Sequence, residues 1–175
     1  MNLRLGVALA AAWLAFSGCA TSGDSERPAG AGVGTMTVRR SGDGSLFSAA
    51  ARAWFCAADS VLSIAAVGTN WTAAIALRSP WPPADSQYAI GSNFGAGDSA
   101  RLALRPLPGR DSVGFAFTGR SGRVRLRGGT PLSGQFAAVV RADKDSLRVE
   151  GRFDGITVDR NGCAAVLPVP TRPGS

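Results

Sequence analysis

Short stretches in which apolar and polar residues alternate dominate this sequence. In the stretch SLRVEGRFDGITV, residues 146–158, Leu147, Val149 and Phe153 fall on one face and charged residues of alternating sign fall on the other. A period of two is the period of a β-strand, whose successive side chains point to opposite faces of a sheet. No stretch after the N-terminal region keeps a helical period with capping residues at its ends. The pattern therefore predicts an all-β fold.

The alternation in this stretch slips by one position before its end. The apolar series that includes Phe153 is continued by Ile156 and Val158, and Gly155 lies between Phe153 and Ile156. One extra residue in a strand is accommodated by a β-bulge, and glycine is frequent there. We expect a bulge at Gly155.

Comparable stretches recur between clusters of Gly, Ser, Asp and Pro, and consecutive strands with short turns pair antiparallel. They predict an antiparallel two-sheet sandwich or a partly closed barrel, between which the pattern does not decide. The alanine-rich stretch 45–58 predicts a short helix or an irregular edge. The Gly-rich segment 91–101 predicts a hairpin connection. We expect about nine strands, at 34–40, 60–68, 70–78, 86–91, 100–106, 112–119, 122–129, 131–142 and 146–158.

The segment SGRVRLRGG carries the main candidate binding residues. Alternation places Arg123, Arg125 and Arg127 on one face of one strand, at steps of about 7 Å, and Arg120 lies just before them. Such a row binds phosphates or carboxylates through paired hydrogen bonds. The alternative, and the commoner role of surface charge, is a solvated face whose arginines pair across to Glu150 and Asp154.

Trp81 stands between prolines in SPWPPADS, so it does not belong to a central strand. An exposed indole ring at this position would stack on a sugar or on a partner protein. The ring would equally well close one end of the core. Both interpretations remain open on the sequence.

The chain contains no histidine. This excludes Ser-His-Asp and Cys-His catalysis, a histidine general base and histidine-ligated zinc. The segment 91–101 lacks the spaced carboxylates of a calcium loop and the lysine of a phosphate-binding loop. We therefore expect no enzymatic activity, no cofactor and no metal.

The N-terminus has the composition of an export signal. Arg4 is followed by an uncharged, largely apolar run, residues 5–16. This run is too short to span a bilayer, which takes about 20 residues, but it suits the hydrophobic region of a signal peptide.

The residues that end this run, Phe16-Ser17-Gly18-Cys19, resemble the lipobox of bacterial lipoproteins. The resemblance implies removal of residues 1–18, lipidation of Cys19, and export of a protein that is anchored to the membrane. Because the residue after the cysteine is alanine and not aspartate, the resemblance also implies an outer-membrane destination. The alternative is ordinary cleavage after Ala20.

The chain has three cysteines. In an oxidising compartment an odd thiol needs an explanation, and lipidation of Cys19 would provide one. Cys56 and Cys163 then remain, and we expect them to form a disulfide. The alternative is a pair of buried free thiols.

Composition divides the remainder into three parts. Residues 19–34 are rich in Gly, Ser and Ala and predict a flexible tether. Residues 35–167 predict a single β domain. Residues 168–175 are rich in proline and predict a disordered tail.

A second resemblance covers SGRVRLRGGTPLSGQFAAVV and SLRVEGRFDGI, within residues 121–156. It is similar to the C-terminal signature of small, uncharacterised, β-rich bacterial lipoproteins. The signature repeats Gly-x-Phe at the strands. It implies an architecture and no activity, because glycine and phenylalanine serve packing and turns.

Residues 19–175 carry a net charge of +6, since Arg4 is the only charged residue before Cys19. A positive field favours anionic partners, and an exported location disfavours nucleic acid. We expect a lipid-anchored protein of the cell envelope with a structural or partner-binding role, whose partner is an anionic envelope polymer or an envelope protein. The alternative is a lipocalin-like carrier of a small apolar ligand.

Overall fold

The computed structural model describes residues 33–42, 44–95, 97–107, 116–160 and 163. The predicted signal peptide, Cys19, nearly all of the tether and the predicted tail lie outside the described residues. No helix in the described part is both long and apolar enough to cross a membrane. The described residues form the strands β1 (Gly34–Arg40), β2 (Gly44–Cys56), β3 (Val61–Val67), β4 (Trp71–Arg78), β5 (Ser86–Ile90), β6 (Ser99–Pro106), β7 (Phe117–Arg127), β8 (Leu132–Ala142), β9 (Asp145–Ile156) and β10 (Val158–Asp159).

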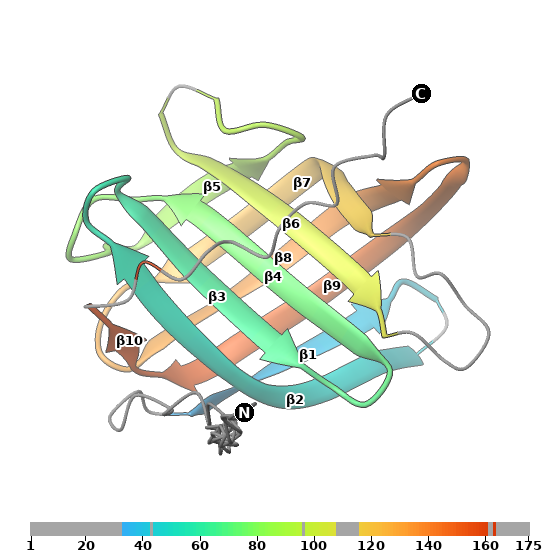
Figure 1. The fold of residues 1–175 in the computed structure, drawn as a ribbon, viewed down its shortest axis with the longest axis horizontal. Coiled ribbons are helices and arrows are strands. Elements are labelled where there is room, and N and C mark those ends of the chain that lie inside the picture. Colours follow the sequence, from blue (N-terminus) through green and yellow to red (C-terminus); the bar gives the residue numbers. More distant parts are fainter. Residues whose placement is uncertain (1–32, 43, 96, 108–115, 161–162, 164–175) are drawn as a thin grey trace, which may run out of the picture.

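Nine of these strands close into a barrel, in the order β1-β9-β8-β7-β5-β6-β4-β3-β2, and β2 pairs with β1 to complete the circle. In Figure 1, β2, β3, β4 and β6 lie in front, while β7, β8, β9 and β1 lie behind. Neighbouring strands are antiparallel except for the parallel pairs β5–β6 and β10–β2. The all-β prediction is confirmed. The architecture is a closed barrel because β1 pairs on one side with β2 and on the other with β9.

Strand β5 fills a wedge between β6 and β7. β7 pairs directly with β6 at Phe117 and Thr118, and its later residues pair with β5 instead. Because β5 and β6 run parallel, the connection between them is not a hairpin, and that prediction is wrong.

Strand β2 replaces the helix or irregular edge expected over 45–58. Its first half pairs with β1 and its second half with β3, so its backbone groups are satisfied by two neighbours. Ala51, Ala53 and Phe55 face the core, with the period of two that a strand requires. Alanine permits a helix but does not demand one, and the two neighbouring strands decide the outcome.

Strand β7 joins two segments that were expected as separate strands, 112–119 and 122–129. The register against β8 shifts between Gly119 and Ser121, so Arg120 is the extra residue of a bulge within one strand. Residues 112–115 lie outside the described part.

The bulge expected in β9 is confirmed. Leu132 pairs with Ile156 and Gly134 with Phe153, which leaves one extra residue on β9. Gly155 lies there with a φ of 70°, a backbone conformation that glycine adopts freely.

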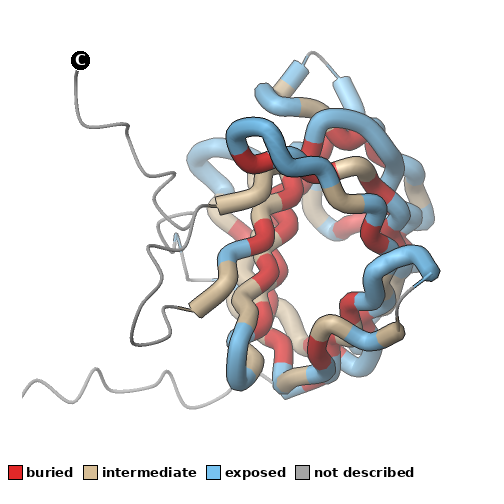
Figure 2. The backbone as a smooth tube through the Cα atoms, turned by 90° about the vertical axis from the view of Figure 1, so that its right-hand side faces the viewer, coloured by how far each residue is buried: buried red, intermediate tan, exposed pale blue. Residues whose placement is uncertain are grey.

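The core lies inside the barrel, where buried residues of the strands face one another (Figure 2). Tyr88 is buried, and its hydroxyl donates a hydrogen bond to Ser79 Oγ over 2.9 Å. Among the described residues, every buried side-chain nitrogen or oxygen has a partner. The largest fully buried side chains are Tyr88, Phe153, Met36, Leu62, Ile64, Ile75, Leu77, Leu102, Leu104, Leu132, Ile156 and Val38.

The disulfide between Cys56 and Cys163 is confirmed, with a Cα–Cα distance of 4.5 Å. It links the last residue of β2 to the segment that follows β10. We call this the disulfide end of the barrel. β1 begins at the same end, because Gly34 lies beside Asp154 and Gly155 near the end of β9.

Candidate binding groove

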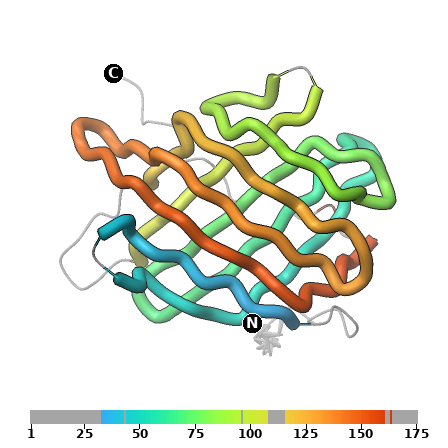
Figure 3. Tube along the Cα trace, turned by 180° about the vertical axis from the view of Figure 1, so that it is seen from behind, coloured from blue at the N-terminus to red at the C-terminus, as the bar shows by residue number. Residues whose placement is uncertain are grey.

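The outward side chains of β7, β8, β9 and β1 form one continuous face, which we call the arginine face. Figure 3 views the molecule from this side. As predicted, Arg123, Arg125 and Arg127 are exposed in alternate positions of β7. The register of the sheet adds arginines from strands distant in sequence, since Arg39 lies on β1 and Arg152 on β9.

A groove runs along β8 on the arginine face and consists of three adjoining hollows. The central hollow has a volume of about 580 Å³ and contains Arg123 and Arg125 among its lining residues. A second hollow, of about 780 Å³ toward the disulfide end, shares Arg125, Gln135 and Arg152 with it. A third, of about 230 Å³ toward the opposite end, shares Ala137 with the first. Since the lining on β8 extends from Ser133 to Val139, the groove is about 20 Å long.

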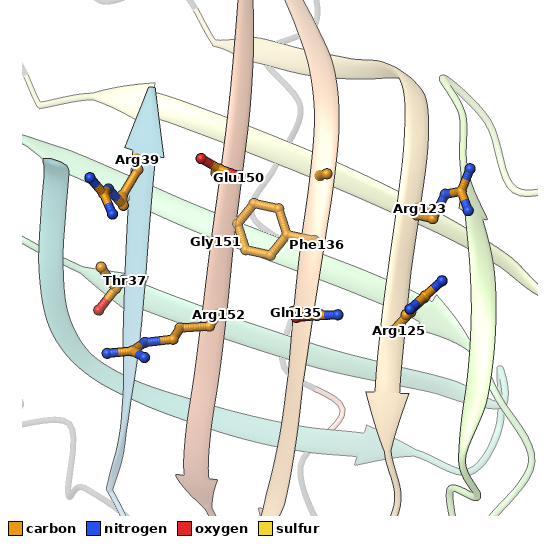
Figure 4. A pocket seen from close by; sticks show the side chains of 10 residues that line it. Thr37, Arg39, Arg123, Arg125, Gln135, Phe136, Glu150, Gly151 and Arg152 are labelled. Atoms are coloured by element: carbon orange, nitrogen blue, oxygen red, sulfur yellow. The ribbon is translucent and has the colours of Figure 1, made fainter. Parts of the chain in front are cut away.

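The groove exists because short side chains lie between long ones. Ala137 faces outward at the centre of β8, where it offers a low floor. Figure 4 shows Arg123 and Arg125 on one side of β8, and Arg39 and Arg152 on the other. These long side chains form the walls.

The Gly-x-Phe repeats fix which residues face the groove. Phe136 pairs with Gly151 and Gly134 with Phe153, so each ring on one strand lies against a glycine of the other. The middle residues of the two repeats then point outward and are paired with each other: Gln135 on β8 and Arg152 on β9.

Successive positions along β8 divide the groove into three levels of cross-strand neighbours. The middle level consists of Thr37, Arg152, Gln135 and Arg125. The level toward the opposite end of the barrel consists of Arg39, Glu150, Ala137 and Arg123. The level toward the disulfide end consists of Thr35, Asp154, Ser133 and Arg127.

The groove arginines lie near acidic residues, and Arg39 is directly across from Glu150 in the register. Among the described residues, none of Arg39, Arg123, Arg125, Arg127 and Arg152 forms an ion pair. Arg125 Nε donates a hydrogen bond to the neutral Gln87 Oε1 over 3.2 Å. Arg123 is separated from Glu150 by Ala137, which lies between them in the register. Pairing of these arginines with Glu150 and Asp154 stays the alternative prediction for this face.

Arg120 stands apart from the other predicted arginines. It is the extra residue of the β7 bulge, and it does not line any of the three hollows. The structure brings Arg123, Arg125 and Arg127 together with Arg39, Arg152 and Gln135, which the sequence did not single out. Gln135 and Arg152 become neighbours through the register of the β8–β9 pair, and Arg39 joins them only because β1 pairs with β9, which is far from it in the chain.

Trp81 lies at the disulfide end, away from the groove. Its ring centroid is 5.0 Å from that of Phe55, and the Arg160 guanidinium carbon lies 4.8 Å from the centroid of Trp81. The side chain is half-buried and packs against the core cluster. This position closes one end of the barrel, and a role as an aromatic ligand contact remains a prediction.

The described residues offer no group of three or more Cys, Asp or Glu side chains that could hold a metal ion. The chemistry of the groove is therefore that of guanidinium, amide, hydroxyl and carboxylate groups.

Comparison of the chain with models of known protein families, with curated proteins and with solved structures gave no match. A function for the groove therefore rests on its geometry and charge.

Proposed function

We propose that this protein is a lipid-anchored binder of a linear anionic polymer of the cell envelope, and not an enzyme. The observation that carries the proposal is the groove on the arginine face, which is long, open and lined by arginines without carboxylate partners among the described residues.

Guanidinium groups bind carboxylates and phosphates through charge-assisted, often paired hydrogen bonds. A single exposed ion pair contributes only about 0–1 kcal/mol, so one contact would not hold a partner. A polymer that touches Arg125, Arg152 and their neighbours at once gains several such contacts. The open shape suits a chain better than a small ligand, which favours enclosed pockets.

The anchor at Cys19 and the export of the protein are part of the same proposal. They are supported by the lipobox resemblance of residues 16–19. Thr35, one residue after the start of β1, lines the groove, so the chain enters the barrel beside the binding face. A tether attached there would hold the groove close to polymers at the membrane surface.

The test compares two double variants that remove the same charge. Arg125→Gln/Arg152→Gln takes both arginines from the middle level, whereas Arg105→Gln/Arg120→Gln removes two exposed arginines outside the groove. The full chain in detergent is titrated with hyaluronan and polygalacturonate, and with dextran as the uncharged control, in a calorimeter.

We expect the groove variant to lose affinity for the acidic polysaccharides by about tenfold, because it removes two exposed charge contacts of up to about 1 kcal/mol each. The control variant should lose much less. Equal losses in both variants would show that only the overall positive field matters, and no binding by the unaltered chain would end the proposal.

A lipocalin-like carrier is the second candidate. A closed barrel is compatible with that function. We place it second because large apolar side chains converge in the interior, and the three hollows described above lie on the outer face.

A further inference from the structure

We infer that the polymer of the groove is a polysaccharide in which acidic sugars are separated by uncharged ones. This inference rests on the proposed function and names its ligand class. The observation behind it is the order of charges along the groove.

The middle level is purely cationic. Arg125 and Arg152 flank Gln135, and their Cα atoms are two strand spacings apart, about 10 Å. No carboxylate belongs to this level. In Figure 4 the Arg125 side chain points toward β5, where its Nε donates to Gln87, and the Arg152 guanidinium lies toward Thr37 on β1. Both side chains are long and exposed, so an anion above the Gln135 amide is contacted from each side when both turn toward β8.

Each neighbouring level carries a carboxylate as well as arginine. Glu150 lies two residues before Arg152 on β9, and Asp154 lies two residues after it, so each acid is about 7 Å from the middle level. Both acids are exposed and line the groove. Asp85 adds a third carboxylate at the disulfide end, where its Oδ1 accepts a hydrogen bond from the Gly128 backbone N–H over 2.8 Å.

Glu150 and Asp154 have no hydrogen-bond or ion-pair partner among the described residues. A carboxylate accepts hydrogen bonds and donates none, so it suits the hydroxyl groups of a neutral sugar. The same carboxylate repels a phosphate or a uronic acid placed beside it. Thr35 and Ser133 add hydroxyl groups at the level of Asp154.

A polymer with a charge on every unit would place anions at both neighbouring levels when it occupies the middle level. There Glu150 and Asp154 offset part of the attraction that Arg39, Arg123 and Arg127 exert on those anions. A polymer with alternating charge would place one anion between Arg125 and Arg152 and hydroxyl groups beside Glu150 and Asp154. The charge order of the groove therefore favours the sparsely charged polysaccharide over polyphosphate or a continuous polyuronate.

The sign of one mutational effect tests this inference. Glu150→Gln/Asp154→Asn removes both acids with nearly unchanged shape, and Asp143→Asn/Asp145→Asn removes two exposed acids in the β8–β9 turn as a control for net charge. The full chain in detergent is titrated with oligosaccharides of hyaluronan, in which charged and uncharged sugars alternate, with polygalacturonate, in which every sugar is charged, and with polyphosphate.

We expect the groove variant to bind hyaluronan oligosaccharides about tenfold more weakly, because the amide oxygens of Gln and Asn accept weaker hydrogen bonds than carboxylates do. It should bind both dense polyanions more tightly. The control variant should bind all three slightly more tightly. If removal of Glu150 and Asp154 leaves hyaluronan binding unchanged or strengthens it, or if the unaltered chain prefers the dense polyanions, the inference is wrong. The proposed function still holds in that case if Arg125→Gln/Arg152→Gln weakens binding of the acidic polysaccharides. If that variant binds them as well as the unaltered chain does, the proposed function is wrong too.

Discussion

The ring of Phe136 lies against Gly151 on the neighbouring strand and occupies the space that a side chain there would need. A Cβ atom on Gly151 would overlap the ring and the backbone oxygen of Thr37. Gly134 and Phe153 repeat the relationship in the opposite direction. An aromatic ring that covers a glycine on the adjacent strand is a known device for holding strand register.

Gly151→Ala should therefore destabilise the domain by about 1–3 kcal/mol, the usual cost of overpacking. The free energy of unfolding is measured by urea denaturation followed by tryptophan fluorescence. Gly95→Ala is the matched control, because a Cβ atom at that loop position meets nothing within 4 Å. Equal stability of the two variants would mean that the ring moves aside at no cost.

The disulfide should contribute a large part of the stability. Cys56→Ser/Cys163→Ser opens a link between residues 107 positions apart. In the chain-entropy account, a loop of this size corresponds to about 4–5 kcal/mol. We expect the denaturation midpoint of the double variant to fall to that of the reduced parent chain. A midpoint that does not move would show that the core alone determines stability.

Binding of acidic polysaccharide should weaken as salt is raised. Ions screen exposed charges over about 10 Å at 0.1 M, which is the width of the middle level. The affinity, followed by calorimetry at low and at high salt, should depend less steeply on salt in Arg125→Gln/Arg152→Gln than in the parent chain. An affinity that is insensitive to salt would contradict a groove that works through guanidinium groups.

Cys19→Ala should release the protein from the membrane. The lipobox resemblance assigns the lipid, and with it the attachment to the membrane, to this thiol. Fractionation of cells that express the parent and the variant, with mass measurement of each product, provides the test. A variant that stays in the membrane fraction at the mass of a lipidated chain would refute the anchor.

Native mass spectrometry should show the chain without a bound small molecule. The core positions are taken by large side chains such as Tyr88, Phe153 and Met36. A retained apolar molecule that is released only on denaturation would move the carrier function ahead of polymer binding.

The strands with clear alternation were predictable because apolar and polar residues alternate in the sequence wherever a strand has one buried face and one exposed face. β9 and its bulge at Gly155 follow from the shift between Phe153 and Ile156 alone. β2 was missed because its alanines suit helix and strand alike, and only pairing with β1 and β3 decides between them. β7 was predicted as two strands because the bulge at Arg120 breaks the alternation without ending the strand.

Neither the closure of the barrel nor the set of residues that lines the groove could be predicted from the sequence, and the reason is the same for both. Both depend on which strands become neighbours and in which register. The row on β7 was visible as a local pattern. Arg152 reaches the same groove through the register of β9 against β8, and Arg39 reaches it only through the pairing of β1 with β9. The Gly-x-Phe repeats were visible too, yet their reciprocal contact appears only when the two strands are placed antiparallel.

The pairing of β1 with β9 also governs when the protein can finish folding. β1 is the first strand of the barrel to be synthesised and β9 is the last. Met36 therefore cannot pair with Phe153, and the sheet cannot close around the core, until β9 has been made. Contacts between distant parts of a chain slow folding, and until they form, an unpaired strand edge stays open to other chains. β1 can pair with β2 as soon as β2 is made, but its edge toward β9 stays open to other chains until nearly the whole sequence has been synthesised.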